Sequence, residues 1–145
     1  MQNVAIILAL LFLPYLALSL AGVPESLCGR IAVALVFIFT GIGHFIKTSV
    51  MAQMLPNGVP MRVPIIHATG VFELLAAGAI LIPPASRPAG IVLCIFLLLI
   101  LPSNIYAAFK RVDFGGHGAG PVYLLIRIPL QLLLIGWIWW FTIRR

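Results

Sequence analysis

The chain has 145 residues, of which 63% are hydrophobic and only 8% are charged. A soluble domain carries about 45–50% apolar and about 25% charged residues, so this composition excludes a water-facing globular domain and intrinsic disorder. Because one helix needs about 20 apolar residues to cross a bilayer, five crossings use about 100 residues. The length therefore predicts one all-α integral membrane domain over 1–145, with no room for a soluble catalytic or nucleotide-binding domain.

The net charge of +6 comes from nine Lys/Arg against three Asp/Glu. In a soluble protein this excess would indicate nucleic acid as a partner. Here the basic residues occur singly or in pairs near the ends of apolar runs, where they anchor helices and contact lipid head groups. We therefore predict membrane lipid as a partner and no nucleic acid, with a multi-pass location in the inner (plasma) membrane.

The first apolar run, over 4–23, is expected to be a retained transmembrane helix. Only Gln2 and Asn3 precede it, so it lacks the basic start of a secretory signal, and it is long for the apolar part of one. Pro14 lies inside the run and is expected to kink the helix.

Three further helices are predicted over 31–46, 64–82 and 89–108. The segment 47–63 between the first two contains prolines and glycines that exclude a continuous helix, although its apolar residues can lie in the membrane interface. The proline-rich stretch 83–88 is expected to end the helix over 64–82 with a tight turn.

The last helix is predicted over 122–143. The connection before it, 109–121, is rich in glycine but lacks a G-K-[ST] sequence and a preceding strand, so we interpret it as a flexible connection rather than a phosphate-binding loop. The clustered tryptophans at the end of the run, followed by two arginines, indicate a helix that leaves the bilayer there: Trp137, Trp139, Trp140, Arg144 and Arg145.

The positive-inside rule does not decide the orientation of these five helices in the membrane, because the basic residues divide equally between the two sides. The side that holds the N-terminus and the other side carry four basic residues each: Lys47, Arg62, Lys110 and Arg111 against Arg30, Arg87, Arg144 and Arg145. We favour an outside N-terminus and an inside C-terminus, because the N-terminal tip has no basic side chain and the last helix ends in an arginine pair.

Ionisable side chains inside the apolar runs are the candidate functional residues, because such groups are costly in hydrocarbon and face the bundle interior. Glu73 is the only acid of its run. Arg127 can either extend to the interface or form an ion pair with Glu73 that offsets the desolvation of both. Gln131 lies one helical turn after Arg127 and can donate to the same carboxylate or to a bound polar ligand.

His44 ends the second run after Gly41 and Gly43, where glycines allow the close approach of a helix or a ligand. It has two interpretations: a hydrogen-bonded structural residue, or a group that binds a quinone carbonyl or relays a proton. Haem ligation by His44 and His67 is disfavoured because nothing in the sequence sets their separation, and no spacing of residues indicates a metal site.

Three more residues belong to this polar set. Thr69 shares a helix face with Glu73, and Gly70 lies beside that face. Asn104 follows Pro102, which frees a backbone carbonyl, so Asn104 is expected either to satisfy the backbone or to contact a ligand. The first helix adds no ionisable group to the set and is expected to be peripheral to a four-helix core.

Six motifs in order resemble the DoxX-like family of small bacterial membrane proteins. The resemblance covers the chain from about Arg30 onward, with Leu101 and Ser103 as mild departures from the usual pattern. The motifs are Gly41-x-x-His44-Phe45, Met54-x-Pro56-x-x-x-Pro60, Thr69-Gly70-x-x-Glu73-Leu74, Arg87, Pro102-x-Asn104-Ile105-Tyr106 and Arg127-x-Pro129-x-Gln131.

This resemblance implies a four-helix transmembrane core, to which the first helix is an addition. It also implies a link to membrane redox systems, since the family is named after a subunit associated with a thiosulfate:quinone oxidoreductase and other members belong to complexes that protect against oxidative stress. A related vertebrate branch assists receptor assembly. Most members of the family have no assigned activity.

Two functional hypotheses follow. In the first, the chain is a quinone- or lipid-contacting subunit of a membrane redox system; Cys28 and Cys94 form no C-x-x-C pair, so electrons would come from partner subunits. In the second, the chain is a non-catalytic assembly or scaffold protein with a structural Glu73–Arg127 pair. A transporter is disfavoured because the chain shows no internal repeat, and the oligomeric state stays open.

Overall fold

A computed structural model describes residues 2–144 of the chain. All its elements are helical, and no strand occurs among these residues, so the all-α fold that the composition predicts is confirmed. The elements are α1 (Gln2–Leu20), α2 (Glu25–Ile46), α3 (Thr48–Ala52), α4 (Arg62–Ala79), α5 (Pro83–Phe109), the 3₁₀ turns η1 (His117–Ala119) and η2 (Pro121–Tyr123), α6 (Leu124–Ile138) and the π-helical turn η3 (Trp139–Ile143).

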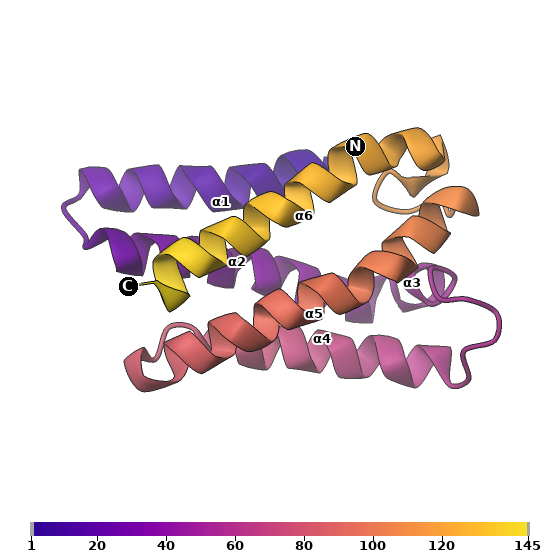
Figure 1. Ribbon diagram of the computed structural model, residues 1–145, viewed down its shortest axis with the longest axis horizontal. Coiled ribbons are helices and arrows are strands. Elements are labelled where there is room, and N and C mark those ends of the chain that lie inside the picture. The colour runs from indigo at the N-terminus through magenta and orange to yellow at the C-terminus, as the bar shows by residue number, and fades with distance from the viewer. Residues whose placement is uncertain (1, 145) are drawn as a thin grey trace.

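The five long helices run along the long axis of an elongated bundle (Figure 1). Helix α2 is central, because it packs against α1, α4, α6 and η3, while α5 packs against α4 and α6. Buried apolar side chains from α1, α2, α4, α5 and α6 form one core between them: Ile7, Leu11, Val33, Val36, Phe37, Ile80, Leu93, Leu97 and Ile138 are among its members.

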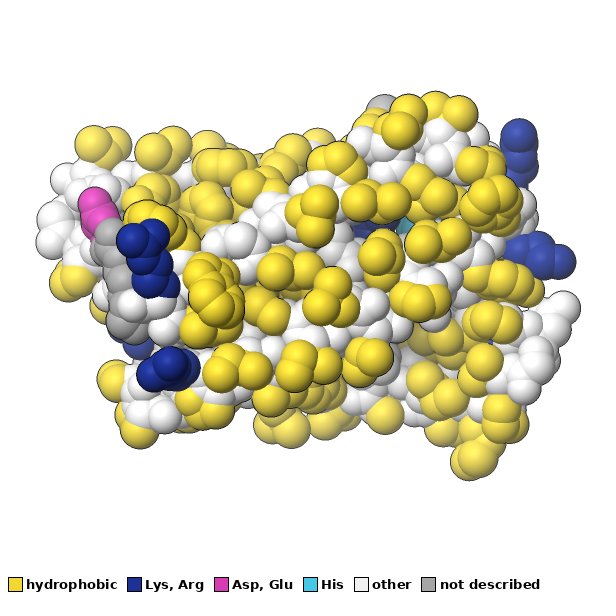
Figure 2. Space-filling model, in the orientation of Figure 1, with side chains coloured by type: hydrophobic (Ala, Val, Ile, Leu, Met, Phe, Trp, Pro, Cys, Tyr) yellow, Lys and Arg dark blue, Asp and Glu magenta, His cyan; other side chains and the backbone are white. Residues whose placement is uncertain are grey.

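Four helical segments are long and apolar enough to cross a membrane: Gln2–Leu20, Glu25–Ile46, Pro83–Phe109 and Pro121–Ile143. Apolar side chains cover the long sides of the face in Figure 2, and Lys and Arg gather at its two ends. Helix α4 is not among the four, because Arg62, His67 and Glu73 lower its hydropathy. It runs beside α2 and α5, and the fifth crossing stays a prediction.

Two helices begin earlier than the sequence pattern predicts. Helix α2 begins at Glu25 rather than near residue 31, because the acidic Glu25 in its first turn favours the helix N-terminus. Helix α5 begins at Pro83, so the expectation of a tight turn over 83–88 is wrong. Proline has no N–H to lose in the first turn of a helix, where that donor has no partner, so these prolines start a helix.

Three local features add detail to the predicted helices. Helix α1 includes Pro14, and although it is largely exposed, its Ile7 and Leu11 enter the core. Segment 47–63 is not a continuous helix, as expected, but it includes the short helix α3. The connection 109–121, interpreted as flexible from its sequence, contains the 3₁₀ turn η1 and the first residue of η2.

One tryptophan of the C-terminal cluster faces the bundle instead of the interface. Trp137 contacts Tyr15 of α1 edge-on at 5.2 Å between ring centroids and donates a hydrogen bond of 3.2 Å to the Gly29 carbonyl. Trp139 and Trp140 are exposed. Trp137 therefore ties α6 to both α1 and α2, which fixes the end of the bundle that holds the C-terminus.

Candidate functional site

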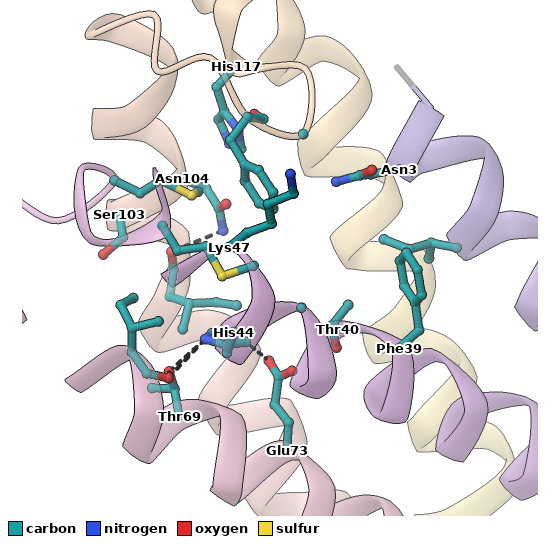
Figure 3. A pocket seen from close by; sticks show the side chains of 18 of the residues that line it. Asn3, Phe39, Thr40, His44, Lys47, Thr69, Glu73, Ser103, Asn104 and His117 are labelled. Carbon is teal, nitrogen blue, oxygen red and sulfur yellow. Dashed lines mark hydrogen bonds and ion pairs between the residues drawn. The ribbon is translucent and has the colours of Figure 1, made fainter. Parts of the chain in front are cut away.

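A cavity of about 490 Å³ lies toward the other end of the bundle. It is bounded by the start of α1, the ends of α2 and α5, α3, α4, the connection 109–121 and the start of α6. Its lining is mainly apolar, with polar side chains converging from several elements (Figure 3). These polar side chains are Asn3, Thr40, His44, Lys47, Thr69, Glu73, Ser103, Asn104, His117, Tyr123 and Arg127.

The central interaction of this site is an ion pair between α2 and α4. The Nε2 atom of His44 lies 3.5 Å from Oε1 of Glu73, and the two side chains are 14% and 5% exposed. On the other side of the ring, Nδ1 lies 3.1 Å from the Ile66 carbonyl oxygen and 3.0 Å from the Thr69 hydroxyl. Figure 3 shows His44 between Thr69 and Glu73.

The surroundings of His44 determine which ring nitrogen carries the proton. A carbonyl oxygen only accepts, and the Thr69 hydroxyl already donates to the same Ile66 carbonyl at 2.8 Å, so Nδ1 of His44 must be the donor to both. The Nε2 atom then faces Oε1 of Glu73. A proton on either of these two atoms would make the contact a hydrogen bond.

Glycines bring α2 and α4 together at this pair. A Cβ atom added at Gly70 would lie 2.7 Å from the His44 Cβ and 3.1 Å from the Gly41 carbonyl oxygen. A Cβ atom at Gly41 would lie 3.0 Å from the Leu74 side chain. The close backbone approach at Gly41 and Gly70 therefore positions His44 against α4.

Arg127 lines the same cavity as Glu73, but the two do not form the ion pair that was one of the two sequence-based interpretations. Within residues 2–144 the salt bridge of Glu73 is to His44, and Arg127 instead lies beside the Tyr123 hydroxyl while interacting electrostatically with Glu73 at longer range. The Nε atom of Arg127 is buried and has no hydrogen-bond partner in the described part of the chain. Both sequence-based interpretations of Arg127, extension to the interface and a direct pair, are therefore replaced by a cavity-facing guanidinium.

Gln131 does not join the site. It is 2% exposed, it is not among the residues that line the cavity, and its side-chain amide donates to the Leu97 carbonyl of α5. Asn104 does line the cavity, and its amide donates to the Ile100 carbonyl of its own helix at 3.1 Å. Gln131 is thus a structural residue between α6 and α5, because the turn that separates it from Arg127 carries it away from the cavity.

His117 is a site residue that the sequence analysis did not single out. It is 3% exposed, its Nδ1 atom donates to the Phe114 carbonyl at 2.8 Å, and its ring meets Tyr123 edge-on at 4.9 Å. Its buried Nε2 atom has no partner within residues 2–144. Gly116, whose φ of 113° only glycine adopts easily, brings the backbone against the Tyr123 ring. The signal in the sequence was a histidine between glycines, which was attributed to flexibility.

The pKa of His117 lies below its usual value, mainly because burial disfavours the charged ring and also because of the positive charge of Arg127, while the hydrogen bond to Phe114 opposes both. The folded state thus binds the proton less readily than the unfolded state. We expect the free energy of unfolding to be constant above pH of about 6.5 and to fall as the pH drops below it. Unfolding of detergent-solubilised protein between pH 5 and pH 8 measures this, and His117→Gln should reduce the slope; an unchanged slope in that variant would contradict the assignment.

His67 does not contribute to the cavity. Its ring is exposed, stacks on Phe45 at 5.5 Å between centroids, and lies 3.2 Å from the Thr48 hydroxyl through Nε2. Among the described residues, no group of three or more His, Cys, Asp or Glu side chains is placed to hold a metal ion.

Comparison with known proteins identifies a family but no function. Residues 33–142 match a protein family described as a domain of unknown function, DUF8561. The chain belongs to the DUF8561 family. No curated protein and no solved structure matches the chain. The family match neither supports nor contradicts the resemblance to the DoxX-like family, which stays a prediction.

The DUF8561 region contains His44, Glu73, Asn104 and Arg127, but it begins after α1. Helix α1 nevertheless contributes Asn3, Val4 and Ile7 to the lining of the cavity. The site in this chain is therefore built by the DUF8561 region together with a helix that lies outside the matched residues.

The cavity of this DUF8561 protein combines apolar walls with a few unpartnered polar atoms. Three buried polar atoms of its lining residues have no hydrogen-bond partner in the described chain: Oε2 of Glu73, Nε of Arg127 and Nε2 of His117. An unpaired buried polar group costs about 1–3 kcal/mol. A ligand or water that donates to His117 and accepts from Arg127 would remove part of that cost.

Proposed function

We propose that the chain is a multi-pass protein of a bacterial inner membrane that binds a quinone-class amphiphile in the cavity beside Glu73. The observation that carries the proposal is the 3.5 Å contact between His44 Nε2 and Glu73 Oε1, in a cavity with apolar walls. A quinone head needs hydrogen-bond donors at its carbonyl oxygens and a source of protons when it is reduced.

Different side chains of the cavity offer the hydrogen-bonding groups and the proton-exchanging groups that a quinone needs. The Arg127 Nε–H is a free donor for a carbonyl oxygen, and the free Nε2 lone pair of His117 accepts from a hydroxyl group. The contact between His44 and Glu73 joins an imidazole and a carboxyl group, the two side-chain types that most often donate or accept protons in catalysis. Electrons would come from a partner subunit of a membrane redox system, which agrees with what the DoxX-like resemblance implies.

Titration of the purified protein with a fluorescent or absorbing quinone analogue tests this proposal. We expect saturable binding that weakens at least about tenfold in His44→Ala, which corresponds to a loss of about 1.4 kcal/mol. His67→Ala is the matched control, because it removes an exposed histidine outside the cavity. Unsaturable binding, or equal binding by wild type and His44→Ala, would contradict the proposal.

A scaffold role is a second candidate, favoured by the interactions that join α2 and α4. His44, Glu73, Thr69 and the Ile66 carbonyl form one hydrogen-bonded group across these helices. In this role the pair stabilises the bundle and needs no ligand. Glu73→Gln separates the two roles: if stability is unchanged while a cellular phenotype is lost, the scaffold role is contradicted.

A further inference from the structure

A second pocket, of about 240 Å³, lies at the end of the bundle opposite the cavity. The start of α2, the start of α5 and the turn η3 form it, and all three meet near the C-terminus in Figure 1. Five of its lining side chains carry N–H or O–H donors, and no carboxylate lines it: Ser26, Arg30, Ser86, Arg87 and Thr142.

Most of these donors are not engaged within residues 2–144. Arg30 donates through Nε to the Ser26 carbonyl at 3.1 Å, which leaves the two terminal nitrogens of its guanidinium. Arg87 is exposed and makes no hydrogen bond or ion pair within that range. Thr142 is only 3% exposed, yet its hydroxyl oxygen is buried without a partner.

The buried hydroxyl groups distinguish this pocket from a chance pair of surface arginines. Ser86, at the second turn of α5, is 5% exposed. The methyl group of Thr142, in η3, packs against Gly90 of α5. A Cβ atom added at Gly90 would lie 2.6 Å from that methyl carbon. The small Gly90 thus allows η3 to approach α5, which brings Thr142 into the same pocket as Ser86 and the two arginines.

We propose that this pocket binds the phosphate group of an anionic membrane phospholipid. Guanidinium groups bind phosphate oxygens through paired hydrogen bonds, and hydroxyl donors can satisfy the remaining oxygens. Exposed apolar side chains lie in the elements beside the pocket, including Ile82 and Trp139, so acyl chains attached to that phosphate have an apolar surface to contact. This inference does not depend on the proposed quinone site.

The test uses the full chain purified in a neutral detergent and native mass spectrometry with added lipid. Phosphatidylglycerol and phosphatidylcholine with the same acyl chains are compared. Inorganic phosphate is added as a competitor that has no acyl chains. We expect phosphatidylglycerol to bind at least tenfold more tightly than phosphatidylcholine, and the double variant Arg30→Gln/Arg87→Gln to lose this preference. The matched control is Arg62→Gln/Lys110→Gln, which removes the same charge at the opposite end of the bundle.

Each other outcome overturns a defined part of the proposal. Equal binding of the two lipids, or equal losses in the two double variants, would show non-specific attraction to charge. Inorganic phosphate that competes for the site as well as the lipid would assign it to free phosphate. Thr142→Val, which changes no charge, should weaken phosphatidylglycerol binding several-fold. An unchanged affinity would show that the buried hydroxyl group does not contact the lipid. Size-exclusion chromatography and circular dichroism establish that each variant is folded.

Discussion

Replacement of Glu73 by alanine is expected to lower the free energy of unfolding by about 3 kcal/mol, because breaking a buried ion pair from one side typically costs about 3–5 kcal/mol. The change leaves His44 beside an empty volume without its carboxylate partner. The lower end of the range applies because the His44 side chain is 14% exposed, so water can reach it. Reversible unfolding in mixed detergent micelles measures the difference.

A double-mutant cycle with His44→Ala is the control for this prediction. If the pair interacts directly, the double variant should be more stable than the sum of the single effects predicts. Glu73→Gln, which keeps the shape of the side chain, should cost less than Glu73→Ala. Additive effects of His44→Ala and Glu73→Ala would contradict a direct interaction between the two side chains.

Substitution of Gly70 is expected to separate α2 from α4. The added Cβ atom of Gly70→Ala would lie 2.7 Å from the His44 Cβ and 3.1 Å from the Gly41 carbonyl, and neither atom is the free end of a flexible side chain. Such overpacking costs about 1–3 kcal/mol, and Gly70→Leu should cost more. We also expect weaker binding of a quinone analogue, because His44 must move.

Gly78→Ala is the matched control on the same helix. A Cβ atom at Gly78 meets nothing within 4 Å, so alanine should be neutral or stabilise α4 by up to about 1 kcal/mol through its higher helix propensity. The same unfolding measurement compares both variants. Equal stability of Gly70→Ala and Gly78→Ala would contradict the close helix approach.

Hydropathy predicted the helices well because it depends on composition along the chain. The positions of helix ends were less predictable. Proline and acidic residues favour a helix in its first turn, but the sequence alone does not show that Pro83 and Glu25 occupy first turns. Segment 109–121 was interpreted as flexible from its glycines. Several of them have positive φ and instead form the tight turns that bury His117.

The members of the site were more predictable than their interactions. His44, Glu73, Asn104 and Arg127 all line one cavity, because polar side chains in apolar helices turn toward the bundle interior. Helical spacing says which residues share a face, but it does not give the relative depth of two helices. A pair with Glu73 was therefore considered for Arg127 but not for His44, and Gln131 was placed in a site from which it is absent.

The short distance between His44 and Glu73 has a consequence for energy coupling. A proton that moves between Nε2 and Oε1 carries charge across at most 3.5 Å, about a tenth of the hydrocarbon thickness of about 30 Å. A full crossing is driven by about 2.3 kcal/mol per 100 mV, so this step gains no more than about 0.3 kcal/mol from the same voltage. The membrane potential therefore hardly biases a transfer within this pair.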